Sequence, residues 1–485
     1  MVIESLKYKI LQQFGFAPTQ EQGQALDTFV SFMTDRDPQA VMILRGSAGT
    51  GKTSLSGAIV RTLLQIRQKV MLLAPTGRAA KVFSLGSGAP AYTIHRRIYR
   101  EKTFAGVDGQ FSLNDNLYTD TLFMVDEASM IANMGLGGTT FGSGCLLDDL
   151  VKFVYQGHND RLLLIGDKAQ LPPVGEEESP ALSASVMEGY GLKVYECDLN
   201  EVLRQSQSSG ILYNATLIRQ MITHDAVTGL PLIRFKGFAD IVMMPGAELV
   251  ESLGDSYHHV GMDETMVITR SNKRANIYNN GIRNMVLDRE EELSSGDMLM
   301  IVKNNYFWTE KEKKESGEGS AGAVPAFLAN GDRAKVLRVS NYIELYGFRF
   351  ATLLLQLPDY DDYEMQVTGM LDTLQSEAPA LTHEQQEELF RQVEEDYQHF
   401  VPLKADRMKS IRQDAYFNAL QIKYAYAVTC HKAQGGQWAH VYVDQGYMTD
   451  DMLTPDYIHW LYTAFTRATE KLFLVNWPKT QTEKQ

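Results

Sequence analysis

One eight-residue stretch, GSAGTGKT at Gly46–Thr53, constrains this chain more than any other part of its sequence. It follows the apolar run Ala40–Leu44 and precedes the helical pattern SLSGAIVRTLLQI, the strand–loop–helix context that a P-loop requires. Glycines in such a loop let successive backbone N–H groups face phosphate oxygens. We expect Lys52 at the β- and γ-phosphates and the Thr53 hydroxyl on Mg²⁺. The residues expected to hold the nucleotide are Gly46, Ser47, Ala48, Gly49, Thr50, Gly51, Lys52, Thr53 and Ser54.

An acidic pair, Asp126-Glu127, ends a second apolar run at Leu122–Val125. We expect Asp126 to hold Mg²⁺ and Glu127 to activate the attacking water, because adjacent carboxylates can divide metal binding from base catalysis. An acidic pair on the surface after a strand is the structural alternative. Phosphoryl transfer also needs positive charge at the terminal phosphate, and Arg204 and Arg467 are the candidate arginine fingers. Spacing alone leaves both arginines open to a second interpretation, as exposed helix residues.

The pattern of apolar runs predicts an α/β fold. Short apolar runs such as AVMILRG and RLLLIGD alternate with helical patterns early in the chain, and similar runs return in HVYVDQG and KLFLVNW. Runs that are apolar on both faces are typical of parallel sheets covered by helices. Between the two α/β blocks we expect a mobile charged loop at Thr309–Ala323, then a small barrel or sheet. An amphipathic helix follows Thr382, which forms a capping-box pattern with Gln385.

The charge and the cysteine content of the chain limit how it can bind nucleic acid and in which cellular compartment we expect it. The net charge is −14, which argues against coating nucleic acid through bulk charge. A local basic segment, Arg78–Lys102, carries six Lys or Arg residues against one acid, and it is either a phosphate track or a solvated helix face. Three distant cysteines give no disulfide framework. No apolar run is long enough to span a membrane, and the first residues lack a secretory pattern. We expect a cytoplasmic protein.

The ordered series of motifs resembles superfamily 1B DNA helicases, the group of RecD-like and phage Dda-like enzymes. The GDxxQLPPV and TxHKxQG patterns are specific to this group, whereas a P-loop alone is not. The resemblance implies two RecA-like P-loop domains, with a β-hairpin insertion in the first and an SH3-like barrel plus a helical insertion in the second. It rests on PTQEQ, GSAGTGKT, LAPTGRAAK, AYTIHR, VDEAS, LIGDKAQLPPVG, LNEVLRQ, YAVTCHKAQGGQW and LYTAFTRATEKL.

The same resemblance implies domain boundaries. The first RecA-like core is expected at 1–200, with the hairpin at about 97–118 and its turn at Asp108-Gly109. The second core is expected at 201–295 and 421–485. The barrel with its helical extension is expected at 296–420, although NGDRAKV departs from the usual NGExGxV pattern.

The family's activity is ATP-dependent 5′→3′ translocation on single-stranded DNA with unwinding of duplex DNA, using ATP and Mg²⁺. Gln22 is then expected to read adenine, Gln170 to sense the γ-phosphate, and Gly435 and Gln437 to lie near the nucleotide. The expected partners are single-stranded and tailed duplex DNA, with repair, recombination or replication proteins in addition, and no membrane; a monomer is expected. The residues expected to contact DNA are Pro75, Thr76, Arg78, Thr93, His95, Arg96, Phe104, Phe111, Thr429 and His431.

Other functions remain open at this stage. A DNA-dependent ATPase module could act as a binding or remodelling subunit of a recombination or repair complex without unwinding DNA by itself. A nuclease centred on the charged loop around Glu312 competes with reading that loop as solvated linker. A P-loop kinase leaves the LPPV and HKAQGG patterns unexplained. Phe104 and Phe111 could stack on a base pair at the DNA junction or could simply pack a surface hairpin.

Overall fold

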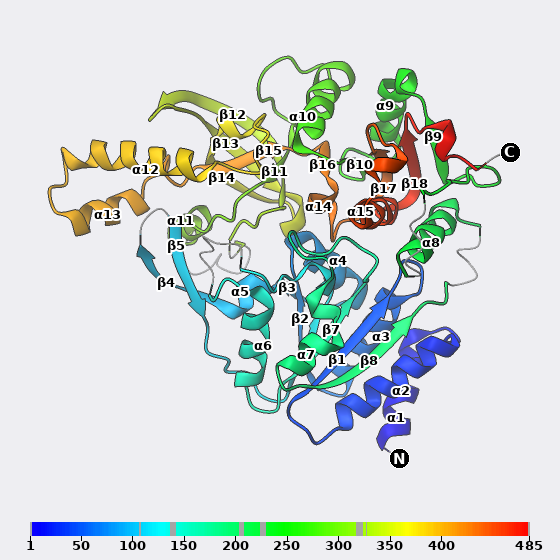
Figure 1. Cartoon of the computed structure of the whole chain (residues 1–485). Coiled ribbons are helices and arrows are strands. Elements are labelled where there is room, and N and C mark those ends of the chain that lie inside the picture. The colour runs from blue at the N-terminus through cyan, green and yellow to red at the C-terminus, as the bar shows by residue number, and fades with distance from the viewer. Residues whose placement is uncertain are drawn as a thin grey trace. The chain divides into compact units, whose positions relative to one another are not determined.

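The computed structural model (Figure 1) describes residues 2–105, 108–135, 142–202, 208–223, 229–316, 324–325 and 327–483. Two compact units make up the chain. One consists of Met1–Met244 with Ala433–Gln485, and the other of Pro245–Lys432. Parallel α/β sheets and a closed barrel are both present, so the predicted fold class is confirmed. Each described helix is either too short or too polar to span a lipid bilayer.

The first unit is built on a six-stranded parallel sheet in the order β3-β2-β6-β7-β1-β8. Val125 of β6 pairs with Leu164 of β7, and Leu44 of β1 pairs with Ile165 of β7. The carboxyl ends of these strands therefore meet at one edge of the sheet. The strands are β1 (Ala40–Gly46), β2 (Lys69–Ala74), β3 (Ala91–Thr93), β6 (Thr121–Val125), β7 (Arg161–Gly166) and β8 (Lys193–Leu199).

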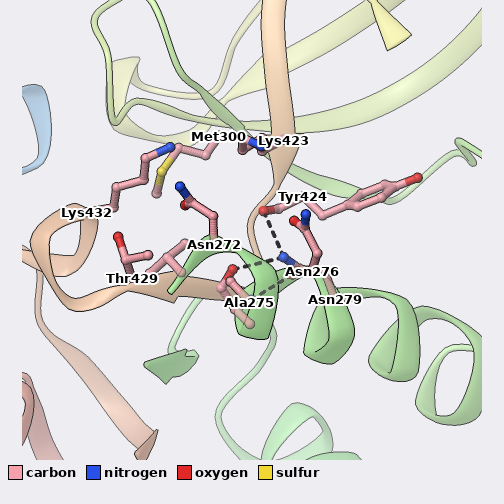
Figure 2. A pocket seen from close by; sticks show the side chains of 11 residues that line it. Asn272, Ala275, Asn276, Asn279, Met300, Lys423, Tyr424, Thr429 and Lys432 are labelled. Atoms are coloured by element: carbon pink, nitrogen blue, oxygen red, sulfur yellow. Dashed lines mark hydrogen bonds between the residues drawn. The ribbon is translucent and has the colours of Figure 1, made fainter. Parts of the chain in front are cut away.

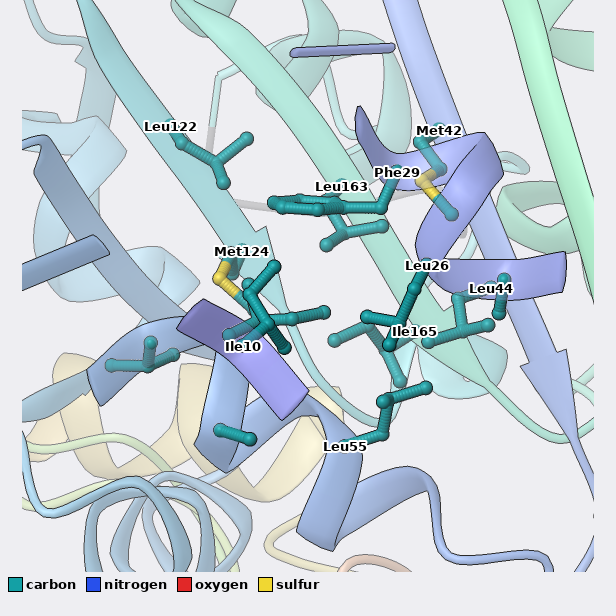
Figure 3. Close-up of a cluster of buried hydrophobic side chains, with 14 of the residues drawn as sticks. Ile10, Leu26, Phe29, Met42, Leu44, Leu55, Leu122, Met124, Leu163 and Ile165 are labelled. Carbon is teal, nitrogen blue, oxygen red and sulfur yellow. The ribbon is translucent and has the colours of Figure 1, made fainter. Parts of the chain in front are cut away.

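Side chains of this sheet alternate between two hydrophobic clusters. On β7, Leu163 belongs to one cluster, whereas Leu162 and Leu164 belong to the other. Figure 3 shows the first cluster, where Leu163 lies among side chains that include Phe29 of a covering helix. Burial on both faces explains why these strands read as continuous apolar runs. The helices are α1 (Val2–Phe14), α2 (Gln20–Thr34), α3 (Lys52–Gln65), α4 (Gly77–Ser87), α5 (Ile94–Ile98), α6 (Leu146–Gln156) and α7 (Ala184–Gly189), with 3₁₀ turns η1 (Ala128–Met130) and η2 (Pro180–Leu182).

A β-hairpin of strands β4 (Tyr99–Ala105) and β5 (Asp108–Leu113) follows helix α5. The hairpin was predicted, but its turn was predicted at the wrong place. Ala105 pairs with Asp108, so Asp108-Gly109 belongs to strand β5, and the two residues that connect the strands lie outside the described residues. Antiparallel pairing up to Ala105 extends the ladder past the local Asp-Gly signal.

The rest of the first unit holds three parallel strands in the order β17-β18-β9. Helices α8 and α15 pack against each other beside these strands. The elements are β9 (Ile241–Met244), β17 (Trp438–Asp444), β18 (Ala468–Val475), α8 (Gly210–Thr223) and α15 (Pro455–Phe465), with 3₁₀ turns η8 (Asp450–Met452) and η9 (Lys479–Gln481).

The second unit contains the closed barrel and a parallel pair of strands, β10 and β16. The barrel strands are β11 (Met298–Ile301), β12 (Arg333–Leu345), β13 (Phe348–Leu357), β14 (Tyr363–Met370) and β15 (Leu420–Tyr424). The remaining elements are α9 (Leu249–His259), β10 (Thr265–Thr269), α10 (Asn272–Gly281), the π-helical turn η5 (Ile282–Val286), α11 (Phe307–Ser316), α12 (His383–Gln398), α13 (Lys404–Arg412), β16 (Ala427–Thr429) and α14 (Cys430–Ala433), with 3₁₀ turns η4 (Gly246–Glu248), η6 (Pro358–Tyr360) and η7 (Leu371–Thr373).

Two expectations for this middle region had different outcomes. The capping box of Thr382 and Gln385 is present at the start of α12, whose Leu389 and Val393 are buried against the barrel. The mobile loop predicted from Thr309 was wrong in its first half, because the chain is helical to the end of α11. Trp308 explains the difference, since its buried ring donates a hydrogen bond from Nε1 to a backbone carbonyl and anchors that helix.

Candidate nucleotide and DNA sites

Three predicted nucleotide segments meet at the carboxyl edge of the six-stranded sheet. The P-loop follows β1, the acidic pair follows β6, and the segment Asp167–Gln170 follows β7. Strands β6, β7 and β1 are direct neighbours in the sheet. Parallel pairing therefore brings together three segments that are separated by 40 to 80 residues in the sequence, as a nucleotide site at a strand edge requires.

The P-loop has the backbone conformation that its glycines predict. Gly49 and Gly51 have φ angles of +77° and +81°, in the left-handed region where side chains are strained, and Gly51 is the N-cap of α3. Lys52 Nζ donates to the carbonyl oxygens of Gly46 and Ser47, the latter at 3.0 Å. The ammonium group is thus turned into the loop, where a phosphate would offer stronger acceptors.

Gln22 reaches the same loop from helix α2. It is almost fully buried, and its side-chain amide donates to the carbonyl of Thr50 at 2.9 Å. Its amide oxygen accepts from the backbone N–H of Thr19, which completes the capping box at the start of α2. The amide thereby joins the helix to the P-loop, and adenine recognition by Gln22 stays a prediction.

The acidic pair carries electrostatic and backbone strain. The Asp126 carboxylate accepts a 2.9 Å hydrogen bond from the N–H of Glu127. Burial and the neighbouring negative charge of Glu127 raise the pKa of Asp126. Glu127 itself has a φ of +52°, which is costly for a residue with a side chain and is found mainly at functional sites. Two crowded carboxylates are a donor set that fits a divalent cation, with Thr53 exposed at the start of α3.

Asp167 and Gln170 follow β7 and are both buried. Asp167 accepts from the backbone N–H of Ala169 at 3.0 Å and from the hydroxyl of Tyr462 at 2.6 Å. Within the described part of the chain, the side-chain oxygen of Gln170 has no hydrogen-bond partner. A buried amide oxygen without a partner, in the segment that follows β7, is consistent with the predicted role in sensing a ligand.

Helix α15 joins the second α/β block to this site. The Tyr462 hydroxyl accepts from the N–H of Ala48 in the P-loop at 2.9 Å while it donates to Asp167. The hydroxyl of the next residue, Thr463, accepts from the N–H of Leu171 at 2.8 Å. Tyr462 was missed by sequence reasoning, and its only signal was its place in the LYTAFTRATEKL motif.

Of the two predicted arginine fingers, the structure describes only Arg467. Arg204 lies outside the described residues. Arg467 is only 2% exposed, and its guanidinium donates to the carbonyls of Thr463 and Gly436 and to the hydroxyl of Thr466. These bonds all lie within the YAVTCHKAQGGQW and LYTAFTRATEKL segments, so a contact between Arg467 and a nucleotide stays a prediction.

The part of the YAVTCHKAQGGQW segment around Gly435 packs closely on helix α4. Gly435 has a φ of +73°, and a Cβ at this position would lie 2.9 Å from the Cβ of Ala79. The Arg78 guanidinium donates to the carbonyl of Gln437 at 3.0 Å and lies over the ring of Trp438. Arg78 and Gln437 were predicted to contact DNA and nucleotide respectively, and the structure brings these two residues together.

The predicted DNA residues of the first unit lie farther along the same sheet edge. Ala74 of β2 pairs with Thr93 of β3, so the segments after these strands are adjacent. Thr76 and Thr93 are the N-caps of α4 and α5 and accept bonds from backbone N–H groups. Burial lowers the pKa of His95 to about 4, so its imidazole is neutral at physiological pH and contributes hydrogen bonding rather than charge.

Of the four other residues of the first unit that were predicted to contact DNA, the structure describes the side chains of three. Pro75 lies between β2 and the start of α4. The Arg96 guanidinium stacks over the ring of Tyr92 at 5.0 Å. Phe111 packs against the core of the first sheet, which favours a packing role in the hairpin, and the side chain of Phe104 is outside the described residues.

Comparison with known proteins identifies matching families and relatives of this chain. A family model described as an AAA domain matches residues 17–229, and one described as a UvrD-like helicase C-terminal domain matches residues 424–475. Together these matches cover more than half of the chain. The chain is 30% identical over 158 residues to the ATP-dependent RecD2 DNA helicase of Deinococcus radiodurans, covering 32% of this chain and 18% of that protein. It is 25% identical over 267 residues to the ATP-dependent DNA helicase dda of Enterobacteria phage T4, covering 53% and 55%.

The chain combines an AAA domain with a UvrD-like helicase C-terminal domain, and it is homologous to the RecD2 and dda helicases of superfamily 1B. Its matched stretches span less than two thirds of the length of either relative. Among solved structures, a Pif1 helicase from Bacteroides in complex with ADP-AlF3 and single-stranded DNA matches with a TM-score of 0.46 and 13% identity, covering 97% of this chain and 95% of that one.

The second unit contains a pocket at the end of strand β16 (Figure 2). Thr429, a predicted DNA contact, lines it together with Asn272 from α10 and two lysines, Lys423 and Lys432. The pocket is further lined by Ala275, Asn276, Asn279, Met300, Tyr424, Ala427 and Val428. None of these described lining residues is acidic, so the charge of the pocket wall is positive.

Both lysines are held in unfavourable surroundings. Burial lowers the pKa of Lys423 to about 8, although its ammonium group donates to the carbonyl of Ser376. Burial and the nearby charge of Lys423 lower the pKa of Lys432 to about 8 as well. In the described part of the chain, Lys432 Nζ is buried without a hydrogen-bond partner. An anion in this pocket would relieve both effects. Sequence reasoning named Thr429 and missed the lysines, which only the folded chain brings together.

His431, the last predicted DNA contact, lies in α14 directly after the Thr429 segment and is exposed. Its neighbour Lys432 points into the pocket (Figure 2). Consecutive residues of the TxHK pattern therefore divide between the surface and the pocket. Both side chains could therefore contact phosphates of one nucleic-acid strand, His431 at the surface and Lys432 in the pocket.

Proposed function

We propose that this chain is an ATP-dependent DNA helicase that translocates 5′→3′ on single-stranded DNA and unwinds duplex DNA. The observation that carries the proposal is the order of segments along one sheet edge. Nucleotide segments follow β1, β7 and β6, and the predicted DNA segments follow the next strands, β2 and β3. Because adjacent strands of one packed sheet support both sets, a change at the nucleotide has a short structural route to the DNA segments.

In the proposed hydrolysis, Lys52 and the P-loop N–H groups bind the phosphates, and Glu127 orients and deprotonates the attacking water. Gln170 senses the terminal phosphate. Asp126 and Thr53 would hold Mg²⁺, which neutralises phosphate charge when it is bound. The raised pKa of Asp126 and the backbone strain at Glu127 support this division of roles, since both features are costly unless a function requires them.

The proposed DNA grip does not read sequence. Its candidate groups are hydroxyls, a neutral imidazole and the lysine-lined pocket, which suit phosphate oxygens rather than base edges. A motor that moves over any sequence needs such a grip. The basic segment Arg78–Lys102 contains helices α4 and α5, which begin where the predicted DNA segments lie, and this supports the phosphate-track interpretation. The 5′→3′ direction rests on the resemblance to superfamily 1B.

The proposal is tested by unwinding of duplexes that carry a 5′ or a 3′ single-stranded tail, with and without ATP and Mg²⁺. We expect unwinding of the 5′-tailed duplex only, and DNA-stimulated hydrolysis of ATP. Unwinding of the 3′-tailed duplex alone would refute the direction. Hydrolysis without unwinding of any tailed duplex would favour the alternative of a DNA-dependent ATPase module in a larger repair or recombination complex.

A substitution tests the assigned base. Glu127→Gln is expected to bind ATP and DNA as the wild type does and to lose about 10²- to 10⁴-fold in turnover, because the amide cannot accept a proton from water. The matched control is Glu188→Gln on α7, where the carboxylate is exposed. Near-normal turnover by Glu127→Gln would remove Glu127 from this role.

A further inference from the structure

Helix α8 lies against the P-loop through one face. Leu212 and Arg219 are seven residues apart, so they project from the same side of this helix. A Cβ on Gly49 would lie 3.2 Å from the methyl groups of Leu212, and the guanidinium of Arg219 donates from Nη1 to the hydroxyl of Ser47. Two points of α8 therefore contact two residues of the P-loop.

Arg219 and the P-loop lysine meet at one residue. Lys52 Nζ donates to the carbonyl oxygen of Ser47, and Arg219 donates to the hydroxyl of the same serine. The Arg219 charge also acts on the hydroxyl of Tyr462, where it opposes the rise in pKa that burial causes. That hydroxyl accepts from Ala48. A P-loop lysine binds the β- and γ-phosphates, so Arg219 contacts the same loop residue as the side chain that is expected to hold these phosphates.

The helix that carries Arg219 is firmly held. Asp240 caps its N-terminus by accepting bonds from the Ser209 hydroxyl and from the N–H of Gly210. In the middle of the helix, the Asn214 side chain bonds the backbone N–H and C=O of Arg234. A change in the hydrogen-bond partner of the Arg219 guanidinium would therefore shift helix α8 and the strand β9 that follows Asp240, and not the Arg219 side chain alone.

We propose that Arg219 recognises the terminal phosphate of bound ATP and so lets the chain distinguish ATP from ADP. This inference rests on the proposed use of ATP. A guanidinium offers a planar fork of N–H donors that matches phosphate oxygens, so it can make two parallel charge-assisted bonds to a phosphate, whereas it makes one bond to the neutral Ser47 hydroxyl. ATP thus draws Arg219 from Ser47 to the γ-phosphate, and ADP leaves it on Ser47. The position of α8 then reports which nucleotide is bound.

The test is equilibrium binding of ADP and of an imido-bridged ATP analogue, each with Mg²⁺, to the full chain. Arg219→Ala is expected to bind the ATP analogue about 10- to 100-fold more weakly, the range for a lost charge-assisted bond, and ADP within about twofold. Arg219→Lys keeps the charge without the fork and is expected to lie between the two.

Control variants separate this role from a structural one. Arg234→Ala removes an arginine that lies over Tyr213 of α8 and pairs with Glu483, and it should leave the preference between nucleotides unchanged. Equal weakening of both nucleotides by Arg219→Ala would overturn the inference. If Arg219→Ala fails to fold, an unchanged preference in Arg219→Lys overturns it. Failure of the wild type to bind the analogue, or equal binding by Lys52→Ala, contradicts the proposed function instead.

Discussion

Replacing Lys432 by methionine should stabilise the fold and weaken DNA binding at the same time. Burial lowers the pKa of Lys432 from 10.5 to about 8, and one pKa unit corresponds to about 1.4 kcal/mol. Keeping Lys432 protonated in the folded chain therefore costs about 3 kcal/mol at pH 7. Methionine is of similar length and carries no charge, so Lys432→Met should raise the free energy of unfolding by up to about 3 kcal/mol.

The sign of the pH dependence follows from the same shift. The folded pKa is below the unfolded one, so the unfolded chain binds more protons between about pH 8 and pH 10.5. Wild-type stability contributed by this group rises through that window. The advantage of Lys432→Met should therefore be full at pH 7 and should fall toward zero near pH 10.5. Urea unfolding followed by circular dichroism at several pH values measures it.

The second part of this prediction concerns the affinity of Lys432→Met for single-stranded DNA. If the pocket holds a DNA phosphate, Lys432→Met should weaken binding of single-stranded DNA and reduce the slope of log affinity against log salt by about 0.7. Lys409→Met, at an exposed position of α13, is the matched control and should change stability little. A less stable Lys432→Met at pH 7 would refute the electrostatic reasoning. A more stable variant with unchanged DNA affinity would refute the phosphate assignment.

Two other predictions concern packing. Gly435→Ala combines a strained φ of +73° with a Cβ that lies 2.9 Å from the Cβ of Ala79, so DNA unwinding should fall at least tenfold. The control Gly446→Ala has a similar φ of +69° in open space and should lower only the stability, so equal unwinding by both variants would contradict the role of the close approach. Leu163→Ala removes a fully buried side chain from the core in Figure 3 and should lower the free energy of unfolding by about 2–5 kcal/mol, so a measured loss below about 1 kcal/mol would count against the packing described.

Local patterns predicted the features that depend on neighbouring residues. The P-loop conformation depends on glycines at fixed positions, and Gly49 and Gly51 adopt the expected left-handed angles. The capping box of Thr382 and Gln385 depends on two residues three apart, and it is present. The hairpin turn was misplaced because Asp-Gly is a local preference, whereas the strand pairing continues beyond it.

The sequence by itself determined the α/β class, and it predicted a phosphate-binding loop after a buried strand and two carboxylates for a metal and a base. These properties follow from residue type and short spacing. Only the tertiary structure decided which groups complete the site. Tyr462 bonds Ala48 across 414 residues, and Arg219 bonds Ser47 across 172. Such contacts arise when separate apolar faces bury each other, and no local pattern records which polar side chains that burial brings together.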